Sequence, residues 1–416
     1  MPQPAQKSSR SVIWFAALIF ALTFSACNLS QRIQDAAAPT DTAVPVEQPT
    51  QGSQIESQAT DKAPEAQPTE TSLPSQTPAP VYTPTESPAF SGIMAFVHNG
   101  LGAYTFTGSP SGFNASLPDV QYLAAYNASV YKDGVAFPNQ DGTVRIVTAQ
   151  GSSDLAFIHA SQPVSVAVSA DGTRIAWTTQ DWLDGATAPE SALWVANMDG
   201  SSAQQVTIIT AAENAETWLV YHPVNWLPDG RLLFATQPSG IGGYILYGEW
   251  NSLHLYDPAS GSLSNIVARE ERLGLAVNSV SHDLSKVAIS ANGIQIRDIS
   301  TQNVVQIPAL ADQNTCGSAR FSPDDQWIAY GCGRNNPDNE AGQIMLARAD
   351  GSAIPVTLYN QDGGAPQVAA WINNTTLLFS TYDNNSGAAS IWRVDTDGSN
   401  LVKLVEGSFV GLIPNP

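Results

Sequence analysis

The segment Ser169-Ala-Asp-Gly-Thr-Arg-Ile-Ala-Trp177 decides the fold, because variants of these nine residues recur along the chain. Each variant has a small or aromatic first residue, a turn, and an apolar stretch that ends in a large residue. The copies begin at Ser129, Ser169, Trp226, Ser281, Ser322 and Trp371, so that successive starts are 40, 57, 55, 41 and 49 residues apart. Asp-Gly and Asn-Asn favour hairpin turns because these residues tolerate positive φ. Each copy therefore predicts two short strands joined by a tight turn.

A second motif follows the first, and its clearest example is Ala192-Leu-Trp-Val-Ala-Asn-Met-Asp-Gly-Ser201. Similar segments begin at Leu253, Gln343 and Ser390. We interpret this motif as a third strand and the turn into a fourth. Short strands repeating about every 48 residues are typical of propeller blades.

The sequence thus predicts an all-β fold, a seven-bladed β-propeller of four-stranded antiparallel blades. Six blades carry the first motif. Strands at Ile93–Val97 and Ala103–Phe106 lack it, and a strand at Ser408–Ile413 remains at the other end. Pairing these ends would close the ring and remove exposed sheet edges. Six or eight blades are the alternatives, because the first blade and the one at 275–308 match the motifs poorly.

The paired motifs resemble the repeats of TolB-type and WD-type propellers, in which a Ser-Pro-Asp-Gly turn precedes Ile-Ala-Phe/Tyr and an Asp-Gly-Ser turn follows. The resemblance covers about residues 91–408 and is specific for fold, not for function. For the TolB family it implies work with periplasmic or envelope partners rather than enzymatic activity.

The N-terminus resembles a bacterial lipoprotein signal. Lys7 and Arg10 precede an apolar run, Val12–Ala26, which is too short for a permanent membrane span. The run ends in Ser25-Ala26-Cys27, which predicts a signal peptide at 1–26 and a lipidated Cys27. An ordinary signal peptide with an incidental cysteine is the alternative.

Residues 27–90 are expected to form a linker between this anchor and a propeller domain at 91–416. Ten of residues 28–90 are proline and nine are threonine. A segment of this composition buries too little apolar surface to offset its ordering entropy, so we expect a disordered Pro/Thr/Gln-rich stalk.

The charge of the chain excludes some partners. The formal net charge is -20, and residues 91–416 hold 29 acidic and 13 basic residues. Nucleic-acid binding requires many Lys and Arg residues, so we expect none. The acidity of the propeller points instead to cationic partners, or metal ions, at a face that carries carboxylates.

Two cysteines remain after Cys27. Cys316 and Cys332 flank the turn of the 322–330 hairpin symmetrically, which places them on facing strands. In an extracytoplasmic compartment such a pair forms a disulfide. Two free buried thiols are the alternative. The cysteine spacing does not fit a metal site.

Long insertions are expected between the second and third strands of blades and between blades, so that they gather on one face. They span 178–191, 211–222, 237–252, 333–342 and 381–389. The candidate ligand-face residues are the aromatic and acidic side chains of these insertions: Asp181, Trp182, Asp184, Trp218, Tyr244, Tyr247, Glu249, Trp250, Asp338, Glu340, Tyr382 and Asp383. Mixed aromatic and carboxylate groups suit sugars or basic protein segments.

The leading hypothesis is a monomeric, membrane-anchored extracytoplasmic binding module that recognises a protein, peptide or glycan through its long-loop face. We assign no catalytic residues, because the sequence lacks a nucleophile elbow, a His-Glu-x-x-His motif and a phosphate-binding loop. A polysaccharide hydrolase or lyase that uses carboxylates in the propeller funnel is the alternative. No cofactor is expected, although Asp338–Glu340 or Asp383–Asn385 offer oxygen ligands for calcium.

Overall fold

The computed structural model describes a continuous series of strands with short gaps. It covers residues 90–98, 100–115, 127–139, 141–159, 165–238, 250–268, 277–310, 313–334, 341–383 and 386–414. The predicted signal peptide, the lipidated Cys27 and the linker up to residue 89 lie outside these residues. No helix in the part described is long and apolar enough to cross a membrane.

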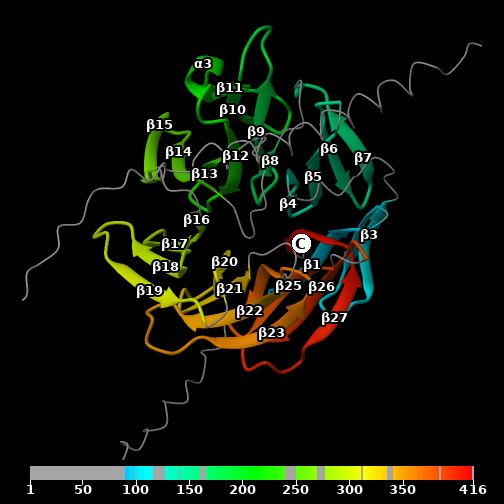
Figure 1. The fold of residues 1–416 in the computed structure, drawn as a ribbon. Helices are drawn as coiled ribbons and strands as arrows, with labels where there is room; N and C mark the ends of the chain where they lie inside the picture. Colours follow the sequence, from blue (N-terminus) through cyan, green and yellow to red (C-terminus); the bar gives the residue numbers. More distant parts are fainter. Residues whose placement is uncertain are drawn as a thin grey trace, which may run out of the picture. The chain divides into compact units, whose positions relative to one another are not determined.

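The described residues form seven four-stranded antiparallel sheets, which follow one another around a ring (Figure 1). Blade 1 consists of β28 (Ser408–Pro414), β1 (Gly92–Val97), β2 (Leu101–Tyr104) and β3 (Pro110–Ala115). Blade 2 consists of β4 (Ser129–Tyr131), β5 (Gly134–Pro138), β6 (Val144–Thr148) and β7 (Gly151–Leu155). Blade 3 consists of β8 (Val166–Val168), β9 (Arg174–Asp181), β10 (Glu190–Asn197) and β11 (Gln204–Ile209). Blade 4 follows a short helix, α3 (Ala211–Asn214), and consists of β12 (Leu219–Trp226), β13 (Leu232–Pro238), β14 (Ser252–Asp257) and β15 (Ser262–Val267).

The last three blades repeat the same order of strands. Blade 5 consists of β16 (Val277–Val280), β17 (Lys286–Ala291), β18 (Gly293–Asp298) and β19 (Val304–Pro308). Blade 6 consists of β20 (Thr315–Phe321), β21 (Trp327–Arg334), β22 (Ala341–Arg348) and β23 (Val356–Asp362). Blade 7 consists of β24 (Gln367–Asn373), β25 (Thr376–Asp383), β26 (Ala388–Asp395) and β27 (Val402–Glu406). The predicted seven-bladed propeller is therefore confirmed, including the blade at 275–308.

The ring closes as predicted, by pairing of the two chain ends. β28 pairs antiparallel with β1, so that Ile413 lies opposite Ile93 and Leu412 opposite Met94. The bounds predicted for the second strand, Ala103–Phe106, are wrong. β2 spans Leu101–Tyr104, and a tight turn follows it. In that turn the Thr105 amide donates to the Ser109 carbonyl oxygen at 2.8 Å.

The apolar residues of the repeated motif pack in both directions around the ring. Side chains alternate between the faces of a strand. In β9, Ile175 and Trp177 therefore pack against blade 2, while Ala176 packs against blade 4. Comparable apolar clusters join every adjacent pair of blades, including blades 7 and 1. Because both faces of the strand are buried, its sequence in the motif is a continuous run of apolar residues.

The serine and aspartate of the first motif fix its turn. Ser169 Oγ donates to Asp171 Oδ1 at 2.6 Å and accepts the Arg174 amide at 2.9 Å. The same bonds occur at Ser281 and at Ser322. Where tryptophan replaces the serine, its indole instead reaches the preceding blade: Trp226 Nε1 donates to the Ala167 carbonyl oxygen at 3.0 Å. The first residue of the motif therefore stabilises the turn when it is serine, and the interface with the preceding blade when it is tryptophan.

Many carboxylates of the propeller accept hydrogen bonds within tight turns. Backbone amides and hydroxyls donate to them, which lowers the carboxyl pKa; for Asp171 and Asp298 the pKa falls to about 2. The other aspartates with lowered pKa between the first two or the last two strands of a blade are Asp199, Asp257, Asp283, Asp350, Asp397 and Asp229, and for Asp229 the main cause is a hydrogen bond from the Arg231 guanidinium. These aspartates lie on the face with the tight turns, whereas Asp141, whose pKa Thr143 lowers in the same way, lies in the β5–β6 turn on the other face. Much of the acidity that we attributed to a ligand face is therefore structural and lies on the opposite face.

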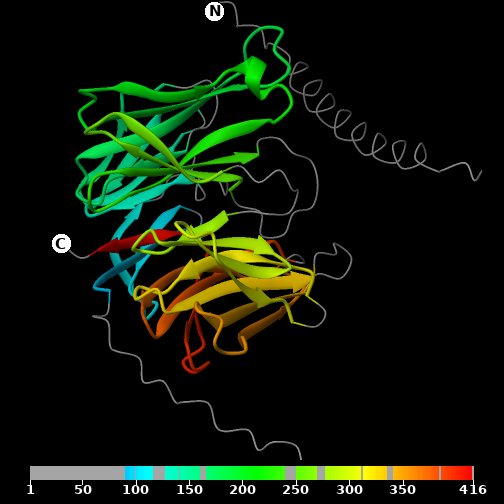
Figure 2. The same ribbon diagram turned by 90° about the vertical axis from the view of Figure 1, so that its left-hand side faces the viewer.

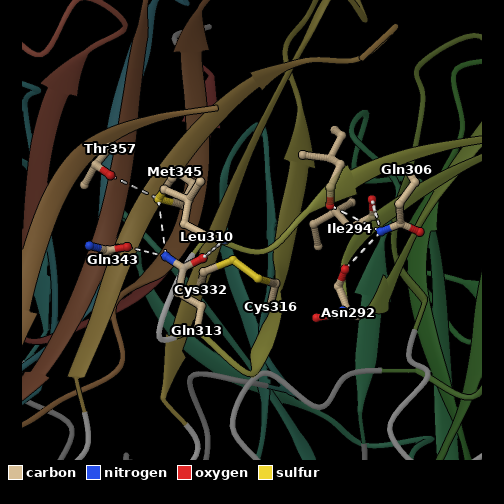
Figure 3. The surroundings of a disulfide bond; sticks show 11 residues. Asn292, Ile294, Gln306, Leu310, Gln313, Cys316, Cys332, Gln343, Met345 and Thr357 are labelled. Carbon is tan, nitrogen blue, oxygen red and sulfur yellow. Dashed lines mark hydrogen bonds between the residues drawn. A yellow bond between two sulfur atoms is a disulfide. The ribbon is translucent and has the colours of Figure 1, made fainter. Parts of the chain in front are cut away.

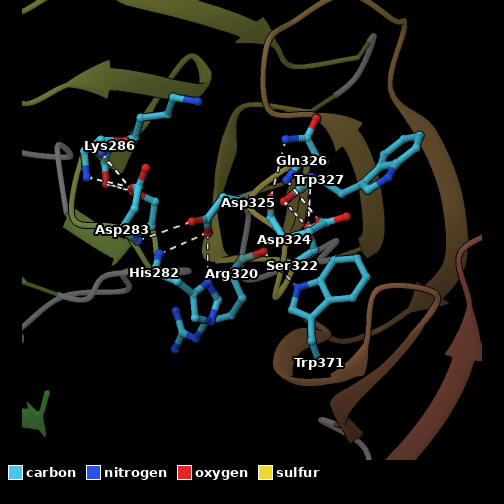
Figure 4. Close-up of polar contacts among 12 residues, drawn as sticks. His282, Asp283, Lys286, Arg320, Ser322, Asp324, Asp325, Gln326, Trp327 and Trp371 are labelled. Atoms are coloured by element: carbon cyan, nitrogen blue, oxygen red, sulfur yellow. Dashed lines mark hydrogen bonds and ion pairs between the residues drawn. The ribbon is translucent and has the colours of Figure 1, made fainter. Parts of the chain in front are cut away.

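Polar contacts also link neighbouring blades on the tight-turn face (Figure 4). Asp325 Oδ1 lies 2.8 Å from His282 Nδ1 and accepts the His282 amide at 3.0 Å, which joins blades 5 and 6. This carboxylate raises the pKa of His282. Between blades 6 and 7, the Asp324 amide donates to Asn374 Oδ1 at 3.2 Å.

The predicted disulfide joins Cys316 and Cys332, which lie opposite one another on β20 and β21 (Figure 3). Both residues are buried in the cluster between blades 5 and 6. Next to the disulfide, the Gln313 amide donates to Gln343. The bridge therefore ties the innermost strand of blade 6 to its neighbour just below the long-loop face.

Candidate ligand-binding face

The long connections gather on one face of the propeller, as predicted. The five long insertions join the second and third strands of blades 3, 4, 6 and 7, or join β11 to β12. Figure 2 shows the ring from the side, with α3 and the neighbouring loop on one side and tight turns on the other. The loops at 239–249 and 335–340 lie outside the described residues. The candidate site is therefore built from the loops of blades 3 and 4.

Two of the predicted residues meet on this face. Trp182 follows β9 and Trp218 precedes β12, and their ring centroids lie 5.5 Å apart in an edge-to-face arrangement. Trp182 is 47% exposed and the adjacent Leu183 is 51% exposed. We call Trp182, Leu183 and Trp218 the tryptophan patch. It is an apolar surface formed by loops from two different connections.

The Trp218 loop is held by a buried amide. Asn214 Oδ1 accepts the Leu219 amide at 2.6 Å, and its Nδ2 donates to the carbonyl oxygens of Pro189 and Leu219 at 2.7 and 2.9 Å. Pro189 belongs to the Trp182 loop, so one side chain connects both loops. A buried polar group with all of its bonds made is rigidly oriented. Asn214 thus fixes the positions of the two tryptophans relative to each other.

A capping box begins the short helix that carries this asparagine. Thr210 Oγ1 accepts the Glu213 amide, and Glu213 accepts the Thr210 amide in return at 3.0 Å. Beyond the helix, Trp218 has a φ of +50°, which is unfavourable for a residue with a side chain. The surrounding hydrogen bonds hold Trp218 in this conformation, which aims its ring at Trp182.

The other predicted ligand-face residues divide into four groups. Asp181 and Asp184 flank Trp182 and so belong to the same surface. Tyr382 is 38% exposed and Asp383 accepts the Ser386 hydroxyl at 2.8 Å, but both lie in blade 7, away from the patch. Trp250 packs against the core between blades 4 and 5, so the structure favours a packing role for it. The remaining predicted residues lie outside the described part: Tyr244, Tyr247, Glu249, Asp338 and Glu340.

Sequence reasoning missed Asn214 and Leu183. Thr210-Ala-Ala-Glu213 has the spacing of a capping box, which could have revealed the short helix. The role of Asn214 had no sequence signal, because its partner Pro189 belongs to another loop.

A partly buried histidine lies on the innermost strand of blade 4. His222 Nδ1 is 2.9 Å from Ser165 Oγ, and Ser165 donates to Asn127 Oδ1 at 3.1 Å. Loss of hydration lowers the pKa of His222 to about 4, so the imidazole is neutral at pH 7. The contacts link blades 2, 3 and 4, which indicates a structural role for His222.

Metal and small-molecule sites have limited support. Within the described ranges no group of three His, Cys, Asp or Glu residues could hold a metal ion. A cavity of about 400 Å³ lies between blades 4 and 5 and includes Ile266, Val287 and Arg297, but none of the predicted residues. The calcium and hydrolase hypotheses depend partly on Glu249, Asp338 and Glu340, outside the described residues, and stay predictions.

Comparisons with known proteins find only distant likenesses among solved structures. No protein-family model and no curated protein matches the chain. Among solved structures, TolB from Acinetobacter baumannii matches with 16% identity and a TM-score of 0.40, over 64% of this chain and 63% of that chain. A periplasmic gluconolactonase of Pseudomonas aeruginosa matches with 11% identity and a TM-score of 0.44, over 79% and 100% of the two chains. An oligogalacturonate lyase in complex with manganese also has 11% identity and a TM-score of 0.44, over 65% and 76%. At such low similarity these proteins say nothing about the ligand of this chain.

Proposed function

We propose that the protein is a membrane-anchored extracytoplasmic binding module, whose long-loop face recognises a protein, peptide or glycan. The observation that carries the proposal is the tryptophan patch. Contiguous exposed apolar surface with polar residues at its rim marks interaction sites, whereas single exposed apolar side chains are common. Asn214 moreover ties together the two loops that carry Trp182 and Trp218, through Pro189 and Leu219, as expected for a preorganised binding surface.

The location and the anchor are inferred from the sequence. Cys27 stands directly after an apolar signal-like run and precedes a Pro/Thr-rich segment. The Cys316–Cys332 disulfide is of the kind found in oxidising compartments. Acylation of Cys27 would hold the propeller at a membrane, and a stalk of 63 residues would let it reach roughly 200 Å from the membrane if fully extended.

Site-directed photo-crosslinking tests the proposed face. The full chain would be produced in its own host with benzoylphenylalanine at position 182, or at position 354 as the matched control. Ile354 is 84% exposed and lies between β22 and β23, on the tight-turn face. We expect discrete crosslinked adducts from position 182 and few from position 354. Equal yields at the two positions, or adducts only at 354, would contradict recognition by the long-loop face.

A further inference from the structure

The two segments that carry the tryptophan patch contain acidic residues and no basic ones. The segments 181–190 and 210–218, which carry the patch, contain five carboxylates and no Lys or Arg. Asp184 lies two residues after Trp182, and Glu216 lies two residues before Trp218; both are exposed. Unlike the turn aspartates of the opposite face, neither lies in a tight turn of the repeated motifs. The charges of Asp184 and Glu216 are therefore accessible to a ligand.

Two further carboxylates lie at the base of the same loop. Asp181 at the end of β9 is paired with Glu190 at the start of β10 in the sheet register. Like charges directly opposite one another destabilise a strand pair. The base of the Trp182 loop thus carries the same sign of charge as its tip.

Aromatic rings and carboxylates together recognise cationic side chains. The face of a tryptophan attracts Lys or Arg with about 0.5–2 kcal/mol, depending on how well water is excluded. Carboxylates at the rim of such a surface speed encounter and select against acidic partners. Leu183 adds apolar surface for the aliphatic part of a long basic side chain.

We propose that the tryptophan patch binds a basic peptide segment, with Trp182 and Trp218 contacting a Lys or Arg side chain and Asp184 and Glu216 supplying the complementary charge. This inference rests on the proposed function, because it specifies the ligand of the same face. A neutral glycan would use the tryptophans but would gain little from the carboxylates. The two ligand classes therefore differ in their dependence on charge.

The test is a titration of the full chain with three probes. The first is a fluorescein-labelled hexalysine peptide, the second is the same peptide with every lysine acetylated, and the third is chitohexaose. Kd is measured at 50 mM and 300 mM salt for the wild-type protein, for Trp182→Ala, and for the charge variant Asp184→Asn with Glu216→Gln. The matched controls on the tight-turn face are Ile354→Ala and Asp133→Asn, whose native side chains are exposed.

The inference predicts that hexalysine binds more tightly than its acetylated form. Trp182→Ala and the charge variant should each weaken hexalysine binding about fivefold or more, as should the higher salt. The two control variants should bind like the wild-type protein. Equal binding of the charged and acetylated peptides would overturn the inference.

The outcomes also separate this inference from the proposed function. Chitohexaose binding that depends on Trp182 but not on the carboxylates or on salt would reject the basic ligand and keep the binding face. If no probe depends on Trp182 and the crosslinks at position 182 are also absent, the binding face itself is rejected.

Discussion

At the scale of single residues, the repeated turn is defined by a small set of hydrogen bonds and one backbone conformation. In the copies that begin at Ser169, Ser281 and Ser322 the fourth residue takes a positive φ, and it is Gly172 in the best copy, with a φ of +71°. In two other copies the same conformation is adopted by Asp325 and Leu284, with φ values of +55° and +58°. The sequence predicts the turns because these determinants are local. Leu284 is the exception that weakened the prediction for blade 5.

Leu284→Gly should stabilise the propeller, because it removes the strain of a branched side chain in the left-handed region, which costs roughly 1–2 kcal/mol. The variant also loses the packing of the half-buried leucine and gives the unfolded chain more conformational entropy. Both effects oppose the stabilisation, so we expect the free energy of unfolding to rise by about 0.5–1 kcal/mol. Urea unfolding monitored by tryptophan fluorescence measures it. The control is Ser285→Gly at the next position, which has no positive φ and should destabilise. A loss of stability in Leu284→Gly would contradict this prediction, because it would mean that the positive φ of Leu284 costs less free energy than the substitution loses in packing and chain entropy.

His222 should make stability depend on pH. Its folded pKa of about 4 lies below the ordinary value of 6.5, so the unfolded chain binds the proton more tightly. The stabilising effect of the neutral state is complete above pH 6.5 and is lost as the pH falls toward 4, by up to about 3 kcal/mol. His222→Gln should flatten this loss while keeping a polar partner for Ser165.

The control for this pH series is His282, whose pKa is raised by Asp325 and whose contribution therefore has the opposite sign. Its stabilisation is present below pH 6.5 and is lost as the pH rises through the folded pKa. Denaturant midpoints of His222→Gln and of His282→Gln, measured between pH 4 and 8, should differ from the wild-type values in opposite directions. Identical pH profiles for wild type and His222→Gln would contradict the burial of a neutral imidazole.

At the scale of strands and loops, the motifs predict which elements form but not which loops meet. The alternating apolar residues of β9 are predictable because both faces of a blade are buried against neighbours. The meeting of Trp182 and Trp218 is not, since it depends on α3 and on contacts of Asn214 with a distant loop. The position of the aspartates was equally hard to predict. Their abundance suggested a ligand face, yet most of those with lowered pKa accept hydrogen bonds from backbone amides in tight turns.

Removal of β28 tests the closure of the ring. Ending the chain after Gly407 would leave β1 with an unpaired edge and would remove Phe409, Leu412 and Ile413 from apolar clusters. At about 1.5–3 kcal/mol for each buried large side chain, the loss should be roughly 5 kcal/mol or more. Calorimetry should show a large fall in Tm. Deleting only residues 415–416 is the control and should change little. An unchanged Tm in the longer deletion would mean that the ends do not close the ring.

At the scale of the whole molecule, the protein combines a propeller with a predicted anchor and a predicted stalk. The fold could be predicted almost completely, because a repeat fold uses the same local signals many times. The anchor stays a prediction from the sequence around Cys27. The binding face was predicted as a set of long loops and stays a prediction; in the described part of the chain, the structure brings together Trp182 of the β9–β10 loop and Trp218 of the β11–β12 connection.

Cys27→Ala should release the protein from the membrane fraction, because acyl chains contribute about 0.8 kcal/mol per buried CH₂. Membrane and soluble fractions of the host would be compared by immunoblotting. Ser25→Gly is the matched control, since it keeps a small residue before the cysteine and should leave the protein anchored. Retention of the Cys27→Ala protein in the membrane fraction would contradict the lipoprotein assignment.

The central claim is that Trp182 and Trp218 form one binding surface, and fluorine NMR tests it most directly. The chain would be labelled with 5-fluorotryptophan, and signals would be assigned with single Trp→Phe variants at positions 182, 218, 226 and 371. On addition of hexalysine, we predict that the signals of Trp182 and Trp218 shift together with one Kd, while those of the well-buried Trp226 and Trp371 stay in place. Shifts of all four signals alike, or no shift of the Trp182 and Trp218 signals, would contradict the account.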